Sequence, residues 1–163
     1  MARWKKRKPD ARVSDDDRRR RFACPPRRGT LDDIDLSLLD PADPDDRGML
    51  ILAEHPELAE AIECGEDEVL VGDETVNPRL HITMHEIVAT QLWADDPPEV
   101  WVTAKRLLAA GYERHDVLHM LGSALMGEIW DVLQDRGSPQ DRSGYVQRLE
   151  ALPESWHRLA ETE

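Results

Sequence analysis

Residues 77–93, NPRLHITMHEIVATQLW, decide the fold that the sequence predicts. Asn77 suits the N-cap of a helix and Pro78 suits its first turn. The apolar residues that follow recur at helical spacing and form one stripe, which would face a core. His81 and His85 lie on the flank of this stripe. Because residues four apart lie on one side of a helix, both imidazoles point the same way.

A second stretch, residues 113–136, repeats this arrangement with the sequence ERHDVLHMLGSALMGEIWDVLQDR. Its apolar stripe has His115 and His119 at one edge. Gly122 lies beside them, and because it has no side chain another helix can approach closely there. If the two helices pack along these edges, four imidazoles point at one place.

The rest of the chain predicts further helices joined by short loops. One is expected over residues 46–64, with a kink or break at Pro56 near His55. Others are expected from about residue 98 to 110, and after the cap-like residues 138–141. Short loops favour packed neighbouring helices. We predict an all-α fold, a compact bundle of four to five helices, with a short strand at residues 69–71.

Charge divides the chain into two unequal parts. Residues 1–28 contain 12 Lys or Arg and 4 Asp, whereas the other 135 residues contain 9 Lys or Arg and 30 Asp or Glu. A segment with few apolar residues and blocks of like charge does not offset its ordering entropy. We therefore predict a disordered basic tail at 1–28, an extended strap or linker at 29–45, and a helical domain at 46–163.

Composition also narrows the class of protein. The two cysteines, Cys24 and Cys64, are far apart, which argues against a disulfide framework or a cysteine zinc knuckle. No apolar run approaches the roughly 18 residues that span a bilayer. The basic start lacks the apolar region of a signal peptide. We expect a cytoplasmic protein with no membrane partner.

The paired histidines suggest a site for a transition metal. Neutral imidazole is the commonest nitrogen ligand, and Zn and Fe are the ions that best suit such a set. The predicted metal site consists of His81, His85, His115, His119 and Glu128. A second interpretation remains open, in which the histidines lie at helix interfaces and bond to carbonyl or carboxylate oxygens.

Familiar catalytic motifs fit the chain poorly. In H-E-x-x-H a glutamate between two zinc ligands acts as general base, but here Glu86 follows the second histidine and points outward. The inverted motif needs Glu where the chain has Met84. The sequence contains no G-x-S-x-G, Walker or Rossmann motif. It therefore assigns no reaction to this chain.

The segment Asn77-Pro78-x-Leu80-His81-x-x-x-His85, with the later His115-x-x-x-His119 and Glu128, resembles a bacterial family of small helical proteins. That family is the domain of unknown function 1841. The similarity covers about residues 48–152. It implies that these residues form one unit, and it implies no reaction. The basic residues 1–28 fall outside it.

The N-terminal segment offers an alternative function. Basic runs attract phosphate, and aromatic side chains such as Trp4 stack on bases. The residues that would contact RNA or a ribosome are Lys5, Lys6, Arg7, Lys8, Arg18, Arg19, Arg20 and Arg21. We thus predict first a cytosolic metal-binding helical protein of unassigned reaction. The alternative is a non-catalytic adapter or nucleic-acid-associated protein in which the histidines are structural.

Overall fold

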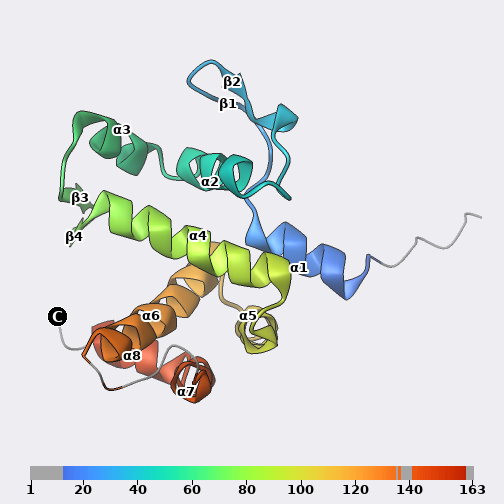
Figure 1. Ribbon diagram of the computed structural model, residues 1–163, viewed down its shortest axis with the longest axis vertical. Coiled ribbons are helices and arrows are strands. Elements are labelled where there is room, and N and C mark those ends of the chain that lie inside the picture. Colours follow the sequence, from blue (N-terminus) through green and yellow to red (C-terminus); the bar gives the residue numbers. More distant parts are fainter. Residues whose placement is uncertain (1–12, 135, 137–140, 161–163) are drawn as a thin grey trace, which may run out of the picture.

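The computed structural model describes residues 13–134, 136 and 141–160, and these residues form eight helices (Figure 1). The helices are α1 (Asp15–Ala23), α2 (Pro44–Ala53), α3 (Pro56–Cys64), α4 (Pro78–Ala94), α5 (Pro98–Ala109), α6 (Arg114–Leu133), α7 (Ser143–Glu150) and α8 (Glu154–Ala160). The predicted helical class is confirmed. The predicted number of four to five helices is wrong, because proline divides one expected helix and the segments at both ends of the chain add others.

Helix α4 is the central element and contacts α1, α2, α3, α5 and α6 (Figure 1). It begins as predicted, with the Asn77 side chain accepting a hydrogen bond from the Leu80 N–H and with Pro78 in the first turn. It ends at Asp95, whose φ of 57° lies in the left-handed region. The central position of α4 makes it the element on which the other helices are placed.

The expected helix over residues 46–64 is broken in two at His55. Pro56 lacks the N–H that would continue the helix, so α2 stops at Ala53 and α3 starts at Pro56 itself. Helix α3 then ends at Gly65, whose φ of 75° suits glycine. The break leaves His55 between the two helices, and its side chain is buried.

The close approach that Gly122 allows is made by α4. A Cβ atom at Gly122 would lie 2.2 Å from the Sδ atom of Met84. Helices α4 and α6 therefore pack directly on each other one turn from both histidine pairs. This contact is the feature of the fold that brings the two pairs together.

Two hydrophobic clusters flank α4. The larger one fills the space among α1, α4, α5, α6 and α7 and includes the fully buried Leu92, Leu107, Leu121 and Leu149. The smaller one lies among α2, α3 and α4 and includes Ile51, Leu58 and Ile82. The two clusters hold opposite sides of α4, which fixes its position in the molecule.

Two small antiparallel strand pairs extend from the helices. Strand β1 (Thr30–Leu31) pairs with β2 (Ile34–Asp35), and β3 (Val69–Val71) pairs with β4 (Glu74–Val76). The first pair and the 3-10 turn η1 (Leu36–Leu38) occupy the segment expected to be an extended strap or linker. The strand expected at residues 69–71 is present. Its middle side chain, Leu70, is 67% exposed, so it is an edge strand and not a buried one.

The predicted disordered tail is wrong for residues 15–23, which form helix α1. Ser14 caps the helix by accepting the Asp17 N–H, and three aspartates lie in the first turn with arginines in the last. This order of charges complements the helix dipole. The segment has few apolar residues on average, but they include Phe22 and Ala23 at the end of α1. These two residues are buried in the larger cluster and hold the helix on the domain. Residues 1–12 lie outside the described part of the chain.

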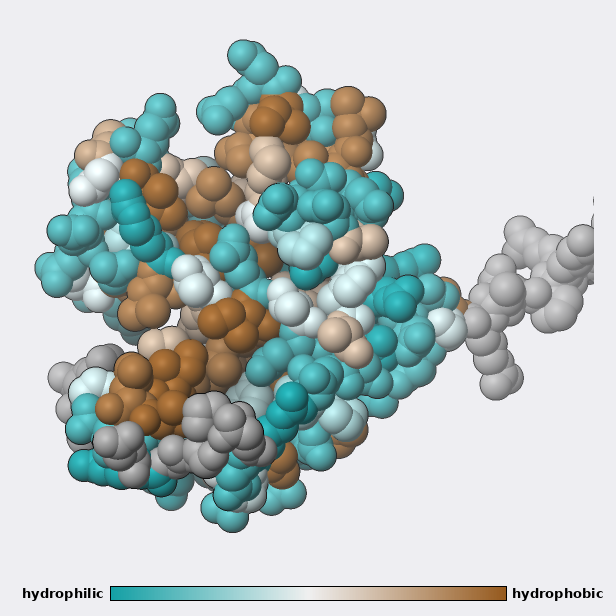
Figure 2. All heavy atoms as spheres, viewed as in Figure 1, coloured by the Kyte–Doolittle hydropathy of each residue, from teal (hydrophilic) through white to brown (hydrophobic). Residues whose placement is uncertain are grey.

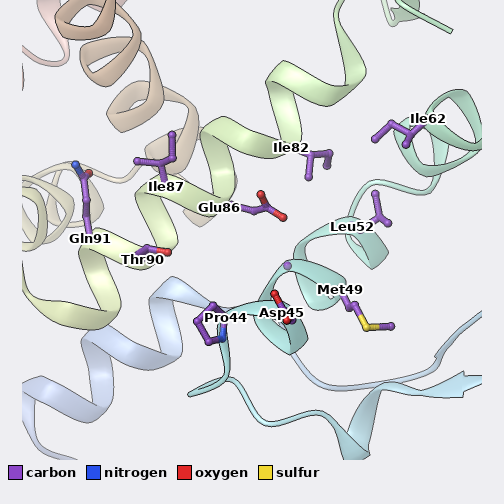
Figure 3. Close-up of a pocket in the computed structure, with 11 residues that line it drawn as sticks. Pro44, Asp45, Met49, Leu52, Ile62, Ile82, Glu86, Ile87, Thr90 and Gln91 are labelled. Atoms are coloured by element: carbon purple, nitrogen blue, oxygen red, sulfur yellow. The ribbon is translucent and has the colours of Figure 1, made fainter. Parts of the chain in front are cut away.

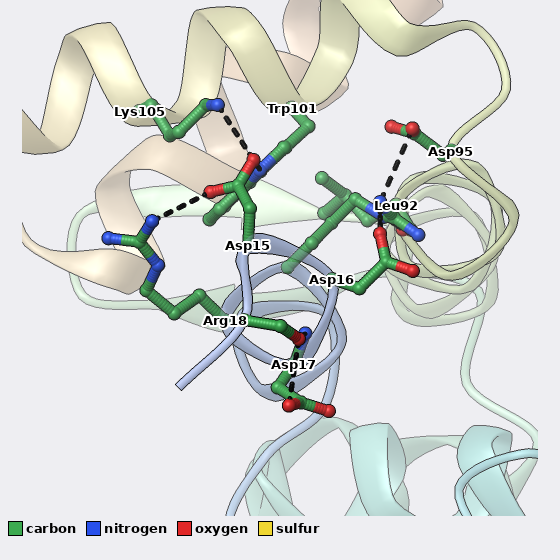
Figure 4. Close-up of polar contacts among 10 residues, drawn as sticks. Asp15, Asp16, Asp17, Arg18, Leu92, Asp95, Trp101 and Lys105 are labelled. Carbon is green, nitrogen blue, oxygen red and sulfur yellow. Dashed lines mark hydrogen bonds and ion pairs between the residues drawn. The ribbon is translucent and has the colours of Figure 1, made fainter. Parts of the chain in front are cut away.

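Polar contacts hold α1 against α4 and α5 (Figure 4). Asp15 accepts hydrogen bonds from the Trp101 indole and from Lys105, each at 3.0 Å. Arg19 is buried and donates to the Leu92 carbonyl at 2.7 Å while it pairs with Asp16 and Asp95. Charges that look solvated in the sequence are therefore paired within the fold.

In the described part of the chain, no helix is long and apolar enough to cross a bilayer. On the face shown in Figure 2, hydrophobic residues gather at the top and at the lower left of the view, and also between the α2–α3 layer and α4. The apolar side chains of Met49, Leu52, Ile62 and Ile82 line a cavity there of about 610 Å³.

Candidate metal centre

Five of the six histidines meet at one place in the fold. His55 comes from the break between α2 and α3, His81 and His85 come from α4, and His115 and His119 come from α6. One ring nitrogen from each of four of them, His55, His85, His115 and His119, lies within 4.8 Å of the others. The convergence of the two H-x-x-x-H pairs, on which the metal hypothesis depends, is thus present.

The rings are packed directly on each other. The His115 and His119 ring centroids lie 4.4 Å apart, and those of His55 and His85 lie 4.6 Å apart. Rings from the two helices are also in contact. The ring centroids of His81 and His119 lie 5.0 Å apart, and those of His85 and His115 lie 5.3 Å apart. The imidazoles form one cluster, with no polypeptide backbone between the rings of one helix and those of the other.

The hydrogen bonding of His55 fixes how its ring is used. Its Nδ1 atom lies 2.9 Å from the Ile51 carbonyl oxygen, and only a protonated nitrogen can donate to that acceptor. The Nε2 atom must then carry the lone pair in the neutral ring. This atom is buried without a hydrogen-bond partner among the described residues, as is Nε2 of His119. Unpartnered buried nitrogens are costly, and they require an explanation.

His81 joins the cluster through His85. Their Nε2 atoms lie 3.2 Å apart, so one ring donates and the other accepts. His85 is buried, whereas His81 is partly exposed at the edge of the cluster. His81 is not one of the four residues whose nitrogens lie mutually within 4.8 Å.

Burial keeps four of the five rings neutral. Loss of hydration, with the neighbouring rings adding to it, lowers the pKa of His81 and His119 to about 4. The same causes lower the pKa of His85 to about 2. The pKa of His115 is also lowered, by burial and by His55. These four rings are therefore unprotonated near neutral pH, which leaves lone pairs available for a cation.

Glu128 is not brought to the histidines. It lies nine residues beyond His119 on α6, 3.9 Å from Arg148, where a Cβ atom on Gly144 would meet its carboxylate at 2.9 Å. The structure therefore gives it a place beside α7. We do not retain it as a ligand.

Glu86 also points away from the rings. It lies in the cavity of about 610 Å³ between α2 and α4, opposite Gly48, whose lack of a side chain makes room for the carboxylate (Figure 3). Its direction away from the histidines is as expected from its helical position, but it faces α2 and is partly buried instead of facing water. A glutamate acting as base beside the cluster, as in H-E-x-x-H enzymes, is absent from α4.

The sequence did not single out His55 as a candidate ligand. It is a lone histidine with no partner at helical spacing, and only the break at Pro56 turns its ring inward. The signal that was present is indirect, because a proline after a histidine predicts a helix break and frees that side chain from the helical surface.

The basic residues proposed to contact nucleic acid have mixed outcomes. Lys5 to Lys8 lie outside the described residues. Arg18 pairs with Asp15, Arg19 is buried, and the Arg20 guanidinium lies 5.3 Å from the Trp93 ring centroid. These three arginines are engaged within the molecule.

Fold and site together define a small helical protein with a partly buried cluster of five histidines. The chain belongs to the family described as domain of unknown function 1841 (DUF1841), whose model matches residues 39–151. All five clustered histidines fall within the matched range, and α1 falls outside it. A comparison with curated proteins gave no significant match, and a comparison with solved structures gave none either.

Proposed function

We propose that this protein binds a transition metal ion, Zn²⁺ or Fe²⁺, through His55, His85, His115 and His119. The observation that carries the proposal is the pair of buried Nε2 atoms, on His55 and His119, that have no hydrogen-bond partner among the described residues. Interfacial histidines with a purely structural role are expected to satisfy both ring nitrogens. A bound cation explains the unpartnered atoms, because it accepts their lone pairs.

The distances suit one ion. Two nitrogens that are each 2.0–2.1 Å from a zinc ion lie at most about 4.2 Å apart. The four candidate nitrogens lie within 4.8 Å of one another. In a tetrahedral site all four nitrogens lie about 3.3 Å apart, so ring rotations that shorten the longest separation by about 1.5 Å bring them within binding distance of one ion. Motions of this size are within the freedom of imidazole side chains.

The second contact of His55 supports the same function. Histidines that bind a metal through one nitrogen usually donate the other N–H to a carbonyl or carboxylate oxygen, which orients the ring. The Nδ1 contact of His55 to the Ile51 carbonyl has this form. It aims the free lone pair of Nε2 toward the other histidines. We also include His81 in the site, as the neighbour that contacts His85.

Charge around the cluster is compatible with a cation. Glu54, next to His55 in the chain, pairs with Arg114 at 2.7 Å, and Glu57 and Asp116 lie close enough to affect His81 and His115. These carboxylates lie outside the proposed ligand set. They offset the positive charge that four neutral imidazoles leave on the ion.

The test is metal content of the full chain purified without a polyhistidine tag. We expect near-stoichiometric Zn or Fe by mass spectrometry. His55→Gln and His119→Gln should each remove most of it, because each deletes one ligand of four. The matched control is His157→Gln, since His157 is the sixth histidine and bonds to Tyr112 away from the cluster. Absence of metal in the wild type after supplementation would contradict the proposal.

The same measurement separates His81 from the four ligands. If His81 only supports the ring of His85, His81→Gln should retain the ion with reduced affinity. If His81 is instead a fifth ligand that full occupancy needs, His81→Gln should lose much of the ion. Circular dichroism of each variant shows whether lost metal reflects lost folding.

A further inference from the structure

A second site lies on the other side of Arg114, where α1 and the segment after it meet α4. It is an open cavity of about 590 Å³. Four arginines and the Trp93 indole contribute to its walls, and we call it the arginine pocket. Its lining is Asp17, Arg20, Arg21, Cys24, Pro25, Pro26, Arg27, Pro41, Trp93 and Arg114. The chain has a net charge of −13, so a concave surface lined by four arginines and one aspartate is unusual.

Positive charge in the arginine pocket is poorly compensated. Asp17 is its single carboxylate, and Arg114 is paired with Glu54 outside the lining. Within the described part of the chain, Arg20, Arg21 and Arg27 have no ion pair with a carboxylate. Arg20 and Arg21 lie in the last turn of α1, where the negative end of the helix dipole partly offsets their charge. A helix end carries only about half an elementary charge, so the offset is small. The pocket therefore keeps a positive excess.

Neutral oxygens hold several of these guanidinium groups in place. Arg27 donates to the Leu39 carbonyl at 2.9 Å, and Arg114 donates to the Phe22 carbonyl at 2.9 Å. Arg47, which is buried and is not part of the lining, donates to the carbonyl of the lining residue Pro41 and to Thr90. Carbonyl oxygens orient a guanidinium without cancelling its charge. The guanidinium groups of Arg27 and Arg114 are thus positioned in advance, which lowers the cost of binding an anion.

Trp93 adds a rigid wall to the same site. The Arg20 and Arg47 guanidinium carbons lie 5.3 and 5.5 Å from its ring centroid. Two cations on one indole leave little of its surface for a stacked base. The pocket therefore favours recognition by charge over recognition by stacking.

We propose that the arginine pocket binds a small phosphorylated molecule through its phosphate or diphosphate group. The planar guanidinium fork matches phosphate oxygens in a bidentate way, and several forks around one cavity suit a multiply charged anion. A long nucleic acid is a poorer fit, because the acidic surface of the body repels a polyanion that extends beyond the pocket.

This inference is independent of the metal site, although the two are neighbours. Arg114 lines the pocket and precedes His115, while its ion-pair partner Glu54 precedes His55. Four of the lining arginines and prolines come from residues 20–26, outside the range that the family model matches. The pocket is therefore built jointly by the family domain and the segment before it.

The experiment is calorimetric titration of the full chain with pyrophosphate, in parallel with a single-stranded oligonucleotide at matched ionic strength. We expect saturable binding of pyrophosphate that Arg21→Gln weakens about tenfold, the size expected for one charge-assisted contact. Arg21 suits the test because its guanidinium has no hydrogen bond or ion pair in the described structure. The matched control is Arg28→Gln, which removes the same charge outside the lining and should change affinity by less than twofold.

Three results would overturn the proposal. The first is a failure to saturate at millimolar pyrophosphate. The second is equal weakening by the Arg21 and Arg28 variants, which would mean general charge attraction. The third is tighter binding of the oligonucleotide than of pyrophosphate, which would mean a nucleic-acid surface. Melting temperatures of both variants show that the comparison is made on folded protein.

Discussion

The histidine cluster and the arginine pocket are neighbouring sites in which basic side chains lie close together. The side chains are neutral in the first site and positively charged in the second. In the cluster, five ionisable rings pack together with neighbouring ring centroids 4.4–5.3 Å apart, and burial lowers the pKa of four of them. In the pocket, guanidinium groups gather around Trp93 with a single carboxylate in the lining. Imidazole can give up its proton, whereas guanidinium cannot.

This difference decides which ligand each site suits. The neutral imidazoles of the histidine cluster offer lone pairs, which bind a cation. The guanidinium groups of the arginine pocket are permanently charged and offer N–H donors, which bind an anion. The Arg114–Glu54 ion pair lies at the boundary and separates the two. The two sites therefore differ in the sign of the ion that they bind. Added metal, low pH and substitutions that remove a charge test this difference.

The largest expected effect is stabilisation by metal. A ligand present at a thousandfold excess over its dissociation constant stabilises the folded state by about 4 kcal/mol. For a chain of this length that corresponds to a rise in melting temperature of about 10 °C. We expect this shift when Zn²⁺ is added to metal-free protein, as measured by differential scanning calorimetry.

The matched variants sharpen that measurement. His55→Gln should lose most of the shift, and His157→Gln should keep all of it. A shift of the same size in both variants would place the ion elsewhere and would remove the distinction between the two sites.

Acid should destabilise the metal-free protein by about 3 kcal/mol between pH 7 and pH 5. The folded-state pKa values of about 4 and about 2 lie below the ordinary value of 6.5, so below pH 6.5 the unfolded chain binds protons that the folded chain does not. Stability is then full above pH 6.5 and is lost as pH falls. Each such histidine contributes up to about 1.4 kcal/mol per pH unit below 6.5, so three of them set an upper limit of about 6 kcal/mol at pH 5. Partial exposure of the rings to solvent reduces this to about 3 kcal/mol.

Urea unfolding at pH 7, 6 and 5 measures this dependence. His119→Gln should reduce the slope, because it removes one of the groups that titrate only when unfolded. Arg21→Gln should leave the slope unchanged, since arginine keeps its charge across the range. A wild-type stability that is flat from pH 7 to pH 5 would contradict neutral burial of the rings.

Much of this arrangement is readable from the sequence. The cap at Asn77, the helix break at Pro56 and the spacing of both histidine pairs are local signals, and each predicts the observed element. The convergence of the pairs was a geometric hypothesis, and Gly122 was the only local hint of close helix packing. Local signals therefore gave the elements and suggested which edges meet.

The remaining features depend on contacts between distant residues. Arg19 bonds to the Leu92 carbonyl, 73 residues away, and nothing in the run Arg18 to Arg21 distinguishes the buried arginine from its exposed neighbours. His55 reaches the cluster only because α2 and α3 separate at Pro56 and both pack on α4. Glu128 has helical spacing consistent with the α6 stripe, but it lies too far along the axis. Such contacts become visible only when the fold is assembled.

Filling the space at Gly122 should disturb the cluster without touching a histidine. A Cβ atom there would meet the side chain of Met84, which is flexible and can partly give way. We expect Gly122→Ala to cost about 2 kcal/mol, as for other overpacked contacts, and to weaken zinc binding because α4 and α6 move apart. Combining it with Met84→Ala should restore part of both losses. Unchanged zinc affinity in the single variant would mean that helix spacing does not set the site.

The smallest effect concerns Arg20 on the face of Trp93. An exposed cation–π contact contributes about 0.5 kcal/mol, and repulsion from Arg47 on the same indole opposes it. We expect Arg20→Gln to destabilise the protein by about 0.5 kcal/mol or less in urea unfolding, and Arg28→Gln to have no measurable effect. If Arg20→Gln instead stabilises the protein, repulsion among the arginines exceeds the attraction of the indole. The free pocket would then be under electrostatic strain that an anion relieves, and pyrophosphate should stabilise the wild type more than the variant.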